Sequence, residues 1–189
     1  MALAYRNPVE LVKGKLKTRH DRIAFAKLHY QLLREPRGLR SWHDSPRDLD
    51  RTLEGAMDLT TFFAYAESDL VGYLLSASIT LEECAFYGSN LQSAGADHIV
   101  PLNARTIPYV GVRSDYQREG VGTQLLEAAV EDAQQKNASS LYALCWKGEG
   151  GASFRLFARL NFETLITFRR SLYADGSSAT LVVRNLAFV

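Results

Sequence analysis

Two glycines at the start of a predicted helix mark the segment of this sequence best suited to chemistry. Residues 117–122 read Gln-Arg-Glu-Gly-Val-Gly and lie between a predicted strand and a predicted helix. The first N–H groups of a helix have no partner within it and lie at the positive end of its dipole, so they favour an anion. Gly120 and Gly122 carry no side chain that would block a phosphate, and Arg118 adds a positive charge. The segment is interpreted as a pyrophosphate cradle. The alternative is a strand-to-helix turn that needs glycine only for its backbone angles.

The commoner phosphate and metal motifs are missing. The sequence has no GxxxxGK[ST] motif, and its glycine spacing differs from the dinucleotide motif GxGxxG. Gly148-Glu149-Gly150-Gly151 is interpreted as a flexible loop. Cys84 and Cys145 form neither a CxxC motif nor a Cys/His cluster, so we expect two reduced thiols and no metal site.

Composition and charge narrow the class of protein. Apolar residues make up 47% of the 189 residues, which is typical of a folded domain. The 22 Lys and Arg residues nearly balance the 21 Asp and Glu residues, which argues against broad binding to nucleic acid or to a membrane surface. We find no apolar stretch long enough to cross a bilayer and no signal-peptide order of residues, so a cytoplasmic protein is expected.

Hydrophobic periodicity places the cradle within a mixed α/β domain. A strand is expected over residues 9–17, followed by two helices within residues 18–58. The remaining strands are expected at 61–66, 70–80, 106–112, 141–146, 164–173 and 179–188, and the remaining helices at 121–137 and 152–160. Residues 81–104 fit no element and are interpreted either as a functional loop or as an irregular connection. The expected order is β-α-α-β-β-β-α-β-α-β-β.

The segment YVGVRSDYQREGVGTQLLEAAVEDAQQKN, residues 109–137, resembles the coenzyme-A motif of the GCN5-related N-acetyltransferases (GNAT). That family has a strand, a Q/R-x-x-G-x-G/A loop and a helix in this order. FFAYAESDLVGYLL resembles the family's central hairpin, LYALCW its next strand and SFRLFARLNFE its short helix. The resemblance implies one GNAT-like domain over residues 1–189, with acceptor-side helices within residues 18–58 and an acyl-CoA-binding core over residues 106–163.

The resemblance also implies which residues bind acetyl-CoA. In the family, the strand before the loop diverges from its neighbour and pairs with the pantetheine arm, the loop amides hold the pyrophosphate, and the short helix lies beside the coenzyme. Carried over to this sequence, the expected contacts are Val110, Gly111 and Val112 on the strand, Gln117, Arg118, Glu119, Gly120, Val121, Gly122 and Thr123 at the loop, and Ser153 and Phe157 on the short helix. Arg155 and Arg159 either face the 3′-phosphate or are ordinary solvated arginines.

The sequence departs from the family at the proton donor. The family's short helix usually carries a tyrosine, four residues before a Gly-Phe pair, that protonates the leaving thiolate. In this sequence Asn161-Phe162 takes the place of the pair, and Phe157 takes the place of the tyrosine. Phenylalanine has no proton to give, whereas asparagine tolerates the left-handed backbone of the replaced glycine.

The usual positions for a general base are also occupied by unsuitable residues. One position lies early in the strand before the loop, where alternation places Thr106 and Pro108 on the face shared with Val112. A second position, at the end of the next strand, falls on Cys145, and Tyr109 lies on the opposite face. Two explanations remain open. Either the amine attacks directly and loses its proton to water, or the acid and base come from Glu82, Glu83, Tyr87, His98 or Glu149.

The resemblance therefore predicts an acyl-CoA-dependent N-acyltransferase that moves an acetyl group to a primary amine of a small molecule or a protein. The alternative is a coenzyme-A-binding sensor or scaffold without activity. The acceptor-side region contains Trp42, His43 and five arginines, namely Arg34, Arg37, Arg40, Arg47 and Arg51. It is interpreted as a solvated basic face balanced by nearby acids or, alternatively, as a site for an anionic acceptor. For the assembly of the whole protein, a homodimer is one option.

Overall fold

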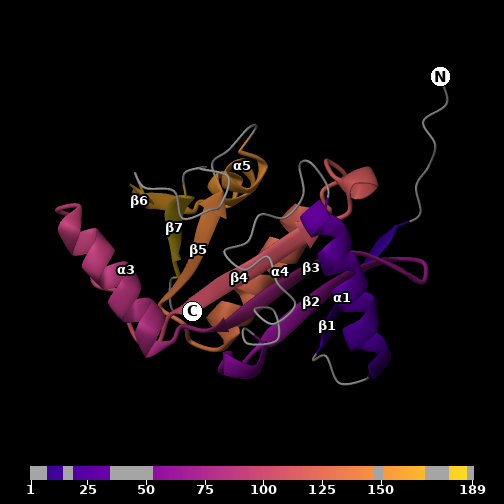
Figure 1. The fold of residues 1–189 in the computed structure, drawn as a ribbon, viewed down its shortest axis with the longest axis horizontal. Helices are drawn as coiled ribbons and strands as arrows, with labels where there is room; N and C mark the ends of the chain where they lie inside the picture. Colours follow the sequence, from indigo (N-terminus) through magenta and orange to yellow (C-terminus); the bar gives the residue numbers. More distant parts are fainter. Residues whose placement is uncertain (1–7, 15–18, 35–52, 147–150, 169–178, 187–189) are drawn as a thin grey trace.

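The computed structural model describes residues 8–14, 19–34, 53–146, 151–168 and 179–186. Its centre is a seven-stranded sheet in the order β1-β2-β3-β4-β5-β7-β6 (Figure 1). The strands are β1 (Val9–Gly14), β2 (Thr60–Ala66), β3 (Asp69–Ser78), β4 (Arg105–Val112), β5 (Ser140–Trp146), β6 (Glu163–Phe168) and β7 (Ala179–Asn185). The pairing of β4 with β5 is parallel, and the other five pairings are antiparallel.

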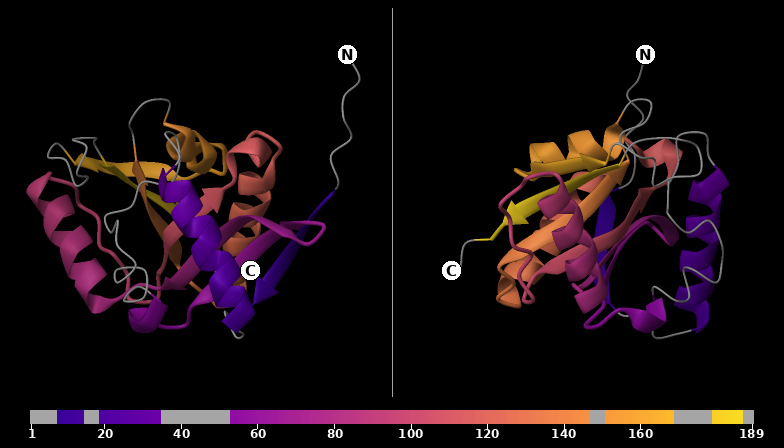
Figure 2. Two further views of the ribbon diagram at one scale, coloured as in Figure 1. Left: turned by 45° about the vertical axis from the view of Figure 1, so that its right-hand side comes forward. Right: turned by 60° about the vertical axis from the view of Figure 1, so that its left-hand side comes forward.

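Helices cover both faces of the sheet (Figures 1 and 2). The helices are α1 (Arg19–Arg34), α3 (Leu81–Ser93), α4 (Val121–Gln135) and α5 (Ala152–Arg159), with the short 3-10 helix η1 (Ser114–Tyr116) before α4. Helices α4 and α5 pack on one face over the largest hydrophobic cluster, which includes Leu74, Ile107 and Ala143. On the other face, α1 covers β2, β3 and β4, and α3 covers β5 and β7.

Helix α4 shows why the periodicity was a reliable guide. Val121, Leu125, Ala129 and Ala133 step by four along the helix, and each is at most 1% exposed. They form a single stripe against the sheet, as the sequence predicted. Every predicted strand is present within the described residues. The predicted second helix falls mostly on residues 35–52, outside the described ranges. Residues 15–17, 169–173 and 187–188 of three predicted strands also lie outside them.

Residues 81–93 form a helix that neither interpretation of residues 81–104 anticipated. Thr80 begins it with a capping box: the Glu83 backbone N–H donates to Thr80 Oγ1 at 3.1 Å, and the Thr80 backbone N–H donates to the Glu83 carboxylate at 2.9 Å. Tyr87 and Leu91 are its buried residues, so its apolar stripe is short. The spacing of Thr80 and Glu83 was the signal in the sequence for this helix.

No helix among the described residues is both long enough and apolar enough to cross a membrane.

Candidate functional site

Strands β4 and β5 diverge, and this opens the sheet at its centre. They pair only over residues 105–107 of β4 and 141–143 of β5. Beyond that point β4 remains paired with β3 as far as Val112, and β5 remains paired with β7 as far as Trp146 (Figure 1). Residues 108–112 and 144–146 are called the two arms of the opening. Because no β5 residue pairs with the β4 arm, its backbone can pair with an extended ligand.

A β-bulge in β4 explains the divergence. Leu75 is opposite Tyr109 and Ala77 is opposite Thr106, so Ile107 and Pro108 together face the single residue Ser76. A bulge bends its strand and increases the local twist, and proline has no N–H to donate to a ladder. Both effects act at the residue where the β4–β5 pairing stops.

The bulge also changes which face each β4 side chain takes. Ile107 lies in the cluster under α4 and α5, and Val110 and Val112 pack against the same cluster. Thr106, as the neighbour of Ile107, therefore faces the α1 side. The prediction that alternation places Thr106 on the face of Val112 is wrong, because the extra residue at the bulge breaks the alternation. Pro108, the other expected base position, is part of the bulge itself.

The cradle segment has the backbone geometry of an anion site. Gly120 has a φ of 84° and begins α4 without any side-chain cap, and Arg118 also has a positive φ of 68°. The first helical bond runs from the Gln124 N–H to the Gly120 carbonyl at 3.0 Å, so the N–H groups of residues 121–123 precede the helical ladder. A Cβ built on Gly120 would meet no atom within 4 Å, so the approach to these groups is open.

Gly122 has a different role from the one that phosphate access suggests. A Cβ at this position would lie 3.2 Å from Leu156 Cδ2 and 3.7 Å from Val112 Cγ2. The absence of a side chain thus lets the first turn of α4 approach α5 and the end of β4. Gly120 is needed for its backbone angle and its open surroundings, and Gly122 is needed for packing.

Polar contacts that sequence reasoning missed hold the segment between β4 and α4. The Gln117 side-chain amide donates to the Val112 carbonyl at 3.0 Å and so joins the loop to the end of the strand. Arg113 donates two hydrogen bonds to the Asp115 carboxylate, at 2.7 and 3.0 Å, and its guanidinium lies 4.8 Å from the centre of the Tyr116 ring. These contacts hold η1 and the loop in place before any ligand binds. No motif in the sequence distinguishes Arg113 from the other arginines.

Helix α5 places its aromatic residue in the core. Phe157 is 2% exposed and meets Phe162 edge-on, with ring centres 4.9 Å apart. Asn161 has a φ of 58°, which confirms the left-handed backbone expected at that position. Ser153 is half-buried, and Arg155 and Arg159 are exposed. The side chain at the family's proton-donor position is therefore part of the hydrophobic core.

Most of the alternative acids and bases have structural contacts. Glu83 belongs to the capping box, and Tyr87 stacks on Tyr142 with ring centres 6.2 Å apart. His98 Nε2 lies 2.7 Å from the Tyr142 hydroxyl. Glu82 is exposed in the first turn of α3, and Glu149 lies outside the described residues. The structure thus groups Tyr87 and His98 around Tyr142, which pairs with Thr106 just before β4 and β5 part.

Cys145 is a poor candidate for proton transfer. The residue is 1% exposed within the core under α4 and α5, and burial raises the pKa of its thiol to about 12. Cys84, on α3, is half-buried, and burial followed by the nearby Glu83 charge raises the pKa of its thiol as well. Both thiols are free. Over the described part of the chain, no group of three or more His, Cys, Asp and Glu residues could hold a metal ion.

A buried aromatic cluster lies under α1, on the opposite face of β4 from Val110. His29 Nδ1 and the Tyr73 hydroxyl share a hydrogen bond of 2.6 Å, and the His29 ring meets the Tyr109 ring edge-on at 5.1 Å between ring centres. Burial lowers the pKa of His29 to about 4, so the imidazole is neutral near pH 7. No motif in the sequence singles out His29.

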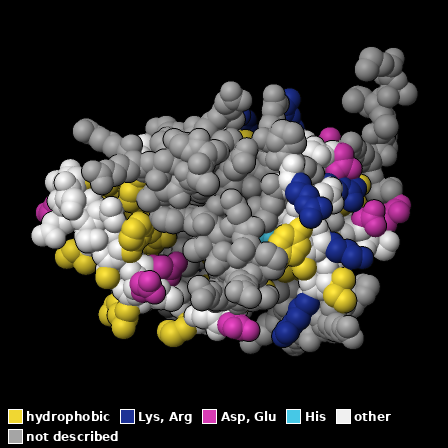
Figure 3. Space-filling model, in the orientation of Figure 1, with side chains coloured by type: hydrophobic (Ala, Val, Ile, Leu, Met, Phe, Trp, Pro, Cys, Tyr) yellow, Lys and Arg dark blue, Asp and Glu magenta, His cyan; other side chains and the backbone are white. Residues whose placement is uncertain are grey.

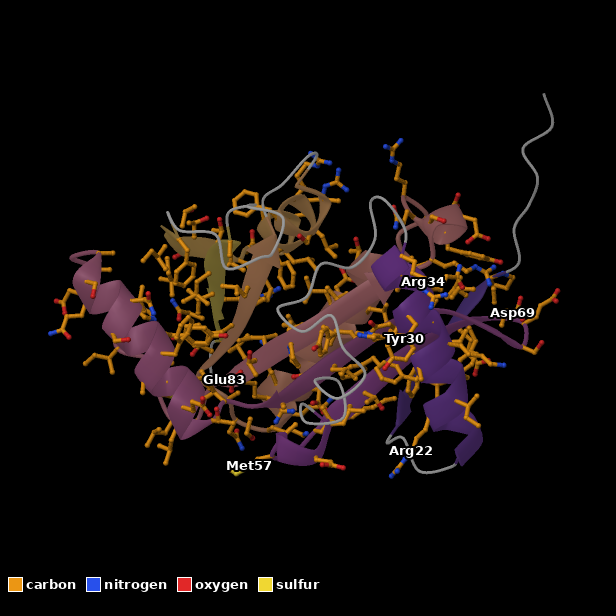
Figure 4. The ribbon with its side chains drawn as sticks, viewed as in Figure 1. Arg22, Tyr30, Arg34, Met57, Asp69 and Glu83 are labelled. Carbon is orange, nitrogen blue, oxygen red and sulfur yellow. The ribbon has the colours of Figure 1, made fainter. Side chains whose placement is uncertain are left out.

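The face between α1 and α3 carries different side chains at its two sides. Lys and Arg side chains gather over α1, and hydrophobic side chains gather where α3 lies (Figure 3). Tyr30 and Arg34 come from α1, and Glu83 comes from α3 at the other side of this face (Figure 4). Arg34 is exposed. The other predicted residues of the basic region, Arg37, Arg40, Trp42, His43, Arg47 and Arg51, lie outside the described ranges.

Comparison with known proteins gives consistent matches. The model of the acetyltransferase (GNAT) family matches residues 26–162. The [ribosomal protein bS18]-alanine N-acetyltransferase of Escherichia coli K12 is 29% identical over 86 residues, which cover 44% of this chain and 57% of that protein. The match thus spans little more than half the length of this relative.

Solved structures show that the fold is shared over nearly the whole chain. A putative acetyltransferase from Salmonella typhimurium, solved with its cofactor acetyl-CoA, has a TM-score of 0.70 at 15% identity. The match covers 96% of this chain and 95% of that protein. The ribosomal-protein-alanine N-acetyltransferase from Brucella melitensis has a TM-score of 0.66 at 19% identity. The match covers 93% of this chain and 99% of that protein.

Proposed function

Because the chain belongs to the acetyltransferase (GNAT) family, we propose that it transfers the acetyl group of acetyl-CoA to a primary amine. The observation that carries this proposal is the combination of an open cradle with diverging strands. The cradle offers N–H groups to a pyrophosphate, and the β4 arm offers an unpaired strand edge to the pantetheine. The two features adjoin each other in the chain, since β4 ends at Val112 and the loop follows.

The residues present fit acetyl-CoA as the acyl donor. The backbone of Val110, Gly111 and Val112 would pair with the pantetheine arm, and the backbone N–H groups between Gln117 and Thr123 would hold the pyrophosphate. Arg118 and Glu119 belong to this segment with exposed side chains, and Val121 is buried and offers only its backbone. Ser153 would contact the coenzyme from α5. The contact expected of Phe157 stays a prediction, because so little of its side chain is exposed.

In the proposed reaction the thioester lies in the opening between the arms. A backbone N–H of β4 near Val110 or Val112 would polarise the thioester carbonyl and stabilise the negative charge that develops on its oxygen. Holding amine and thioester in reacting geometry supplies a large part of the rate enhancement. The free thiol of coenzyme A and an acetylated amine are the products.

Calorimetric titration with acetyl-CoA and with free coenzyme A tests the donor site. We expect micromolar binding of both to the wild-type protein and loss of binding in Gly120→Asp, which places a side chain and a negative charge at the open cradle. Gly95→Asp is the matched control, because Gly95 also has a positive φ, 72°, and open space around its Cβ position. Tight binding by Gly120→Asp would refute the cradle. Loss of binding in Gly95→Asp would show that the substitution acts through the fold.

Thiol release in the presence of amines tests the transfer itself. The first acceptors to try are peptides with a free N-terminal alanine, since two similar proteins are named for that acceptor. Spermidine and free lysine represent small-molecule amines. An inactive coenzyme-A sensor would be favoured if acetyl-CoA binds but no thiol is released in the presence of any of these amines, or of hydroxylamine as a small nucleophile. A homodimer and a cytoplasmic location remain predictions from the sequence.

A further inference from the structure

We propose that Arg105 is the positioning residue that fixes the width of the opening between β4 and β5, and thereby the size of the acyl group that is transferred. This role rests on the proposed acetyl transfer and concerns the donor end of that site. Arg105 is the first residue of β4 and pairs with Leu141 of β5, before the point where the strands part. Its side chain is 3% exposed, so its charge is buried at the closed base of the opening.

The acyl group would lie next to this base because of the direction in which the donor runs. The cradle follows Val112, and the pantetheine would run back along the β4 arm toward Pro108. The acyl group then comes last, beside the residues that still pair. Buried side chains fill the base: Ile107 and Ala143 belong to the core under α4 and α5, and Tyr142 belongs to the cluster under α3. The room for an acyl chain therefore depends on where β4 and β5 part.

Arg105 bonds the residue that faces the bulge in β4. That residue is Ser76 of β3, which lies opposite both Ile107 and Pro108. Arg105 Nε donates to Ser76 Oγ at 3.2 Å, and Arg105 Nη2 donates to the Ser76 carbonyl oxygen at 3.0 Å. Ser76 is 0% exposed, so water does not compete for these two oxygens. One side chain of β4 thus holds the single residue around which β4 bulges.

The far side of the guanidinium is fixed as well. Arg105 Nη1 donates to the Asp58 carboxylate at 2.6 Å, and Nη2 donates to the Asp58 carbonyl oxygen at 2.9 Å, just before β2. The Asp132 carboxylate of α4 lies 3.9 Å from Nη2. A slip of β4 by one residue would move Arg105 about 3.3 Å along β3 and break these bonds. The bonds therefore select the register in which the bulge falls at Ile107 and Pro108.

Two substitutions separate this geometric role from a role of the charge alone. Arg105→Lys keeps the charge, but a single ammonium cannot donate to Ser76 and Asp58 in the fixed arrangement of a planar guanidinium. Arg105→Met keeps a long side chain without donors. Neither variant leaves the Asp132 carboxylate unpaired, because Lys13 Nζ lies 2.7 Å and Lys136 Nζ 3.4 Å from it.

The test measures thiol release from acetyl-CoA and from propionyl-CoA with the best acceptor of the panel above. The ratio of the two kcat/KM values does not depend on the folded fraction, because both are measured on the same sample. In a defined pocket one methylene changes kcat/KM about 10- to 200-fold, so a poorly defined base should lower the acetyl-to-propionyl ratio by about threefold or more. We expect this fall in both Arg105 variants.

The same variants should separate turnover from coenzyme binding. We expect kcat with acetyl-CoA to fall about 100-fold, the effect of displacing reacting groups by about 1 Å. The affinity for free coenzyme A, measured by calorimetry, should stay within error of the wild type, because the cradle lies beyond the other end of the β4 arm. A residue that only stabilised the fold would change neither kcat nor the acyl ratio of the folded protein.

Asp132→Asn is the matched control. It removes a charge from the same buried group of ion pairs and leaves both bonds between Arg105 and Ser76 in place. We expect it to lower the melting temperature and to keep the acyl ratio of the wild type. Ser76→Ala is the complementary variant, because it removes only the hydroxyl that accepts from Arg105 Nε. It should lower the acyl ratio by a smaller factor than Arg105→Met does.

The outcomes distinguish this role from the proposed function. A wild-type kcat and acyl ratio in Arg105→Met, or their full rescue in Arg105→Lys, would overturn the role of Arg105 and leave the proposed function intact. If neither Arg105 variant folds, an unchanged acyl ratio in Ser76→Ala would overturn it instead. Absence of thiol release from the wild-type protein with every acceptor would refute the proposed function, and the role of Arg105 with it.

Discussion

Acidification should destabilise the fold through His29, and the size of the effect follows from its burial. The pKa of His29 is lowered from 6.5 to about 4, because the ring lies in the hydrophobic interior under α1. In the unfolded chain the ring binds a proton near pH 6.5, but in the folded protein it does so only near pH 4. The unfolded state thus gains a proton first as the pH falls, and stability is lost across this interval.

The magnitude comes directly from the two pKa values. A shift of one pKa unit corresponds to about 1.4 kcal/mol, so this histidine contributes a loss of about 3 kcal/mol on going from neutral pH to pH 4. The full stability is present above pH 6.5, and the loss levels off below pH 4. The carboxyl groups of Asp58 and Asp132 have lowered pKa values, so they titrate below this interval and do not mimic the effect.

Urea denaturation at a series of pH values between 7 and 4 measures this contribution. The informative variant is His29→Leu combined with Tyr73→Phe, which removes both partners of the buried hydrogen bond and leaves neither unpaired. We expect the double variant to lose most of the pH dependence between pH 6.5 and 4. A pH dependence equal to that of the wild type would refute the reasoning, because the proton would then bind elsewhere.

Three further predictions concern packing, a buried charge and a helix cap. Gly111→Ala should lower stability by about 1–3 kcal/mol in urea denaturation, because its Cβ would lie 2.5 Å from Leu32 Cδ1 and push α1 away from β4; an unchanged midpoint would show that α1 adjusts freely. Asp132→Asn should lower the free energy of unfolding by about 3 kcal/mol, because this carboxylate is 1% exposed, lies 2.7 Å from Lys13 Nζ and neutralises surrounding cations. Thermal melting at neutral pH measures the loss, and a rise in melting temperature would contradict it. Glu83→Ala should lower the free energy of unfolding by about 1 kcal/mol, because it removes half of the capping box. Amide hydrogen exchange should become faster only in the first turn of α3. Equally faster exchange across the sheet would argue against a local cap.

Local signals in the sequence were sufficient for most of the elements. The four-residue step from Val121 to Ala133 and the turn after β2 depend on neighbours within a few residues, so they can be read directly. Helix α3 was missed although Thr80 and Glu83 have capping-box spacing, because Gly88 and several small polar residues obscure its apolar stripe. The capping-box spacing of Thr80 and Glu83 was therefore a better indicator of this helix than its periodicity.

By itself the sequence determined the order of the strands, the helices α1, α4 and α5, and the left-handed backbone at Asn161, because these depend on local periodicity and on a residue that tolerates a positive φ. Only the tertiary structure decided where β4 and β5 part, which face each β4 residue takes, and which groups meet there. The bulge at Ile107 and Pro108 becomes visible only in the pairing with β3, across about thirty residues of chain. The contact between His29, Tyr73 and Tyr109 likewise joins three separate elements. Register and contact between distant segments arise from packing of the whole core, which no local pattern encodes.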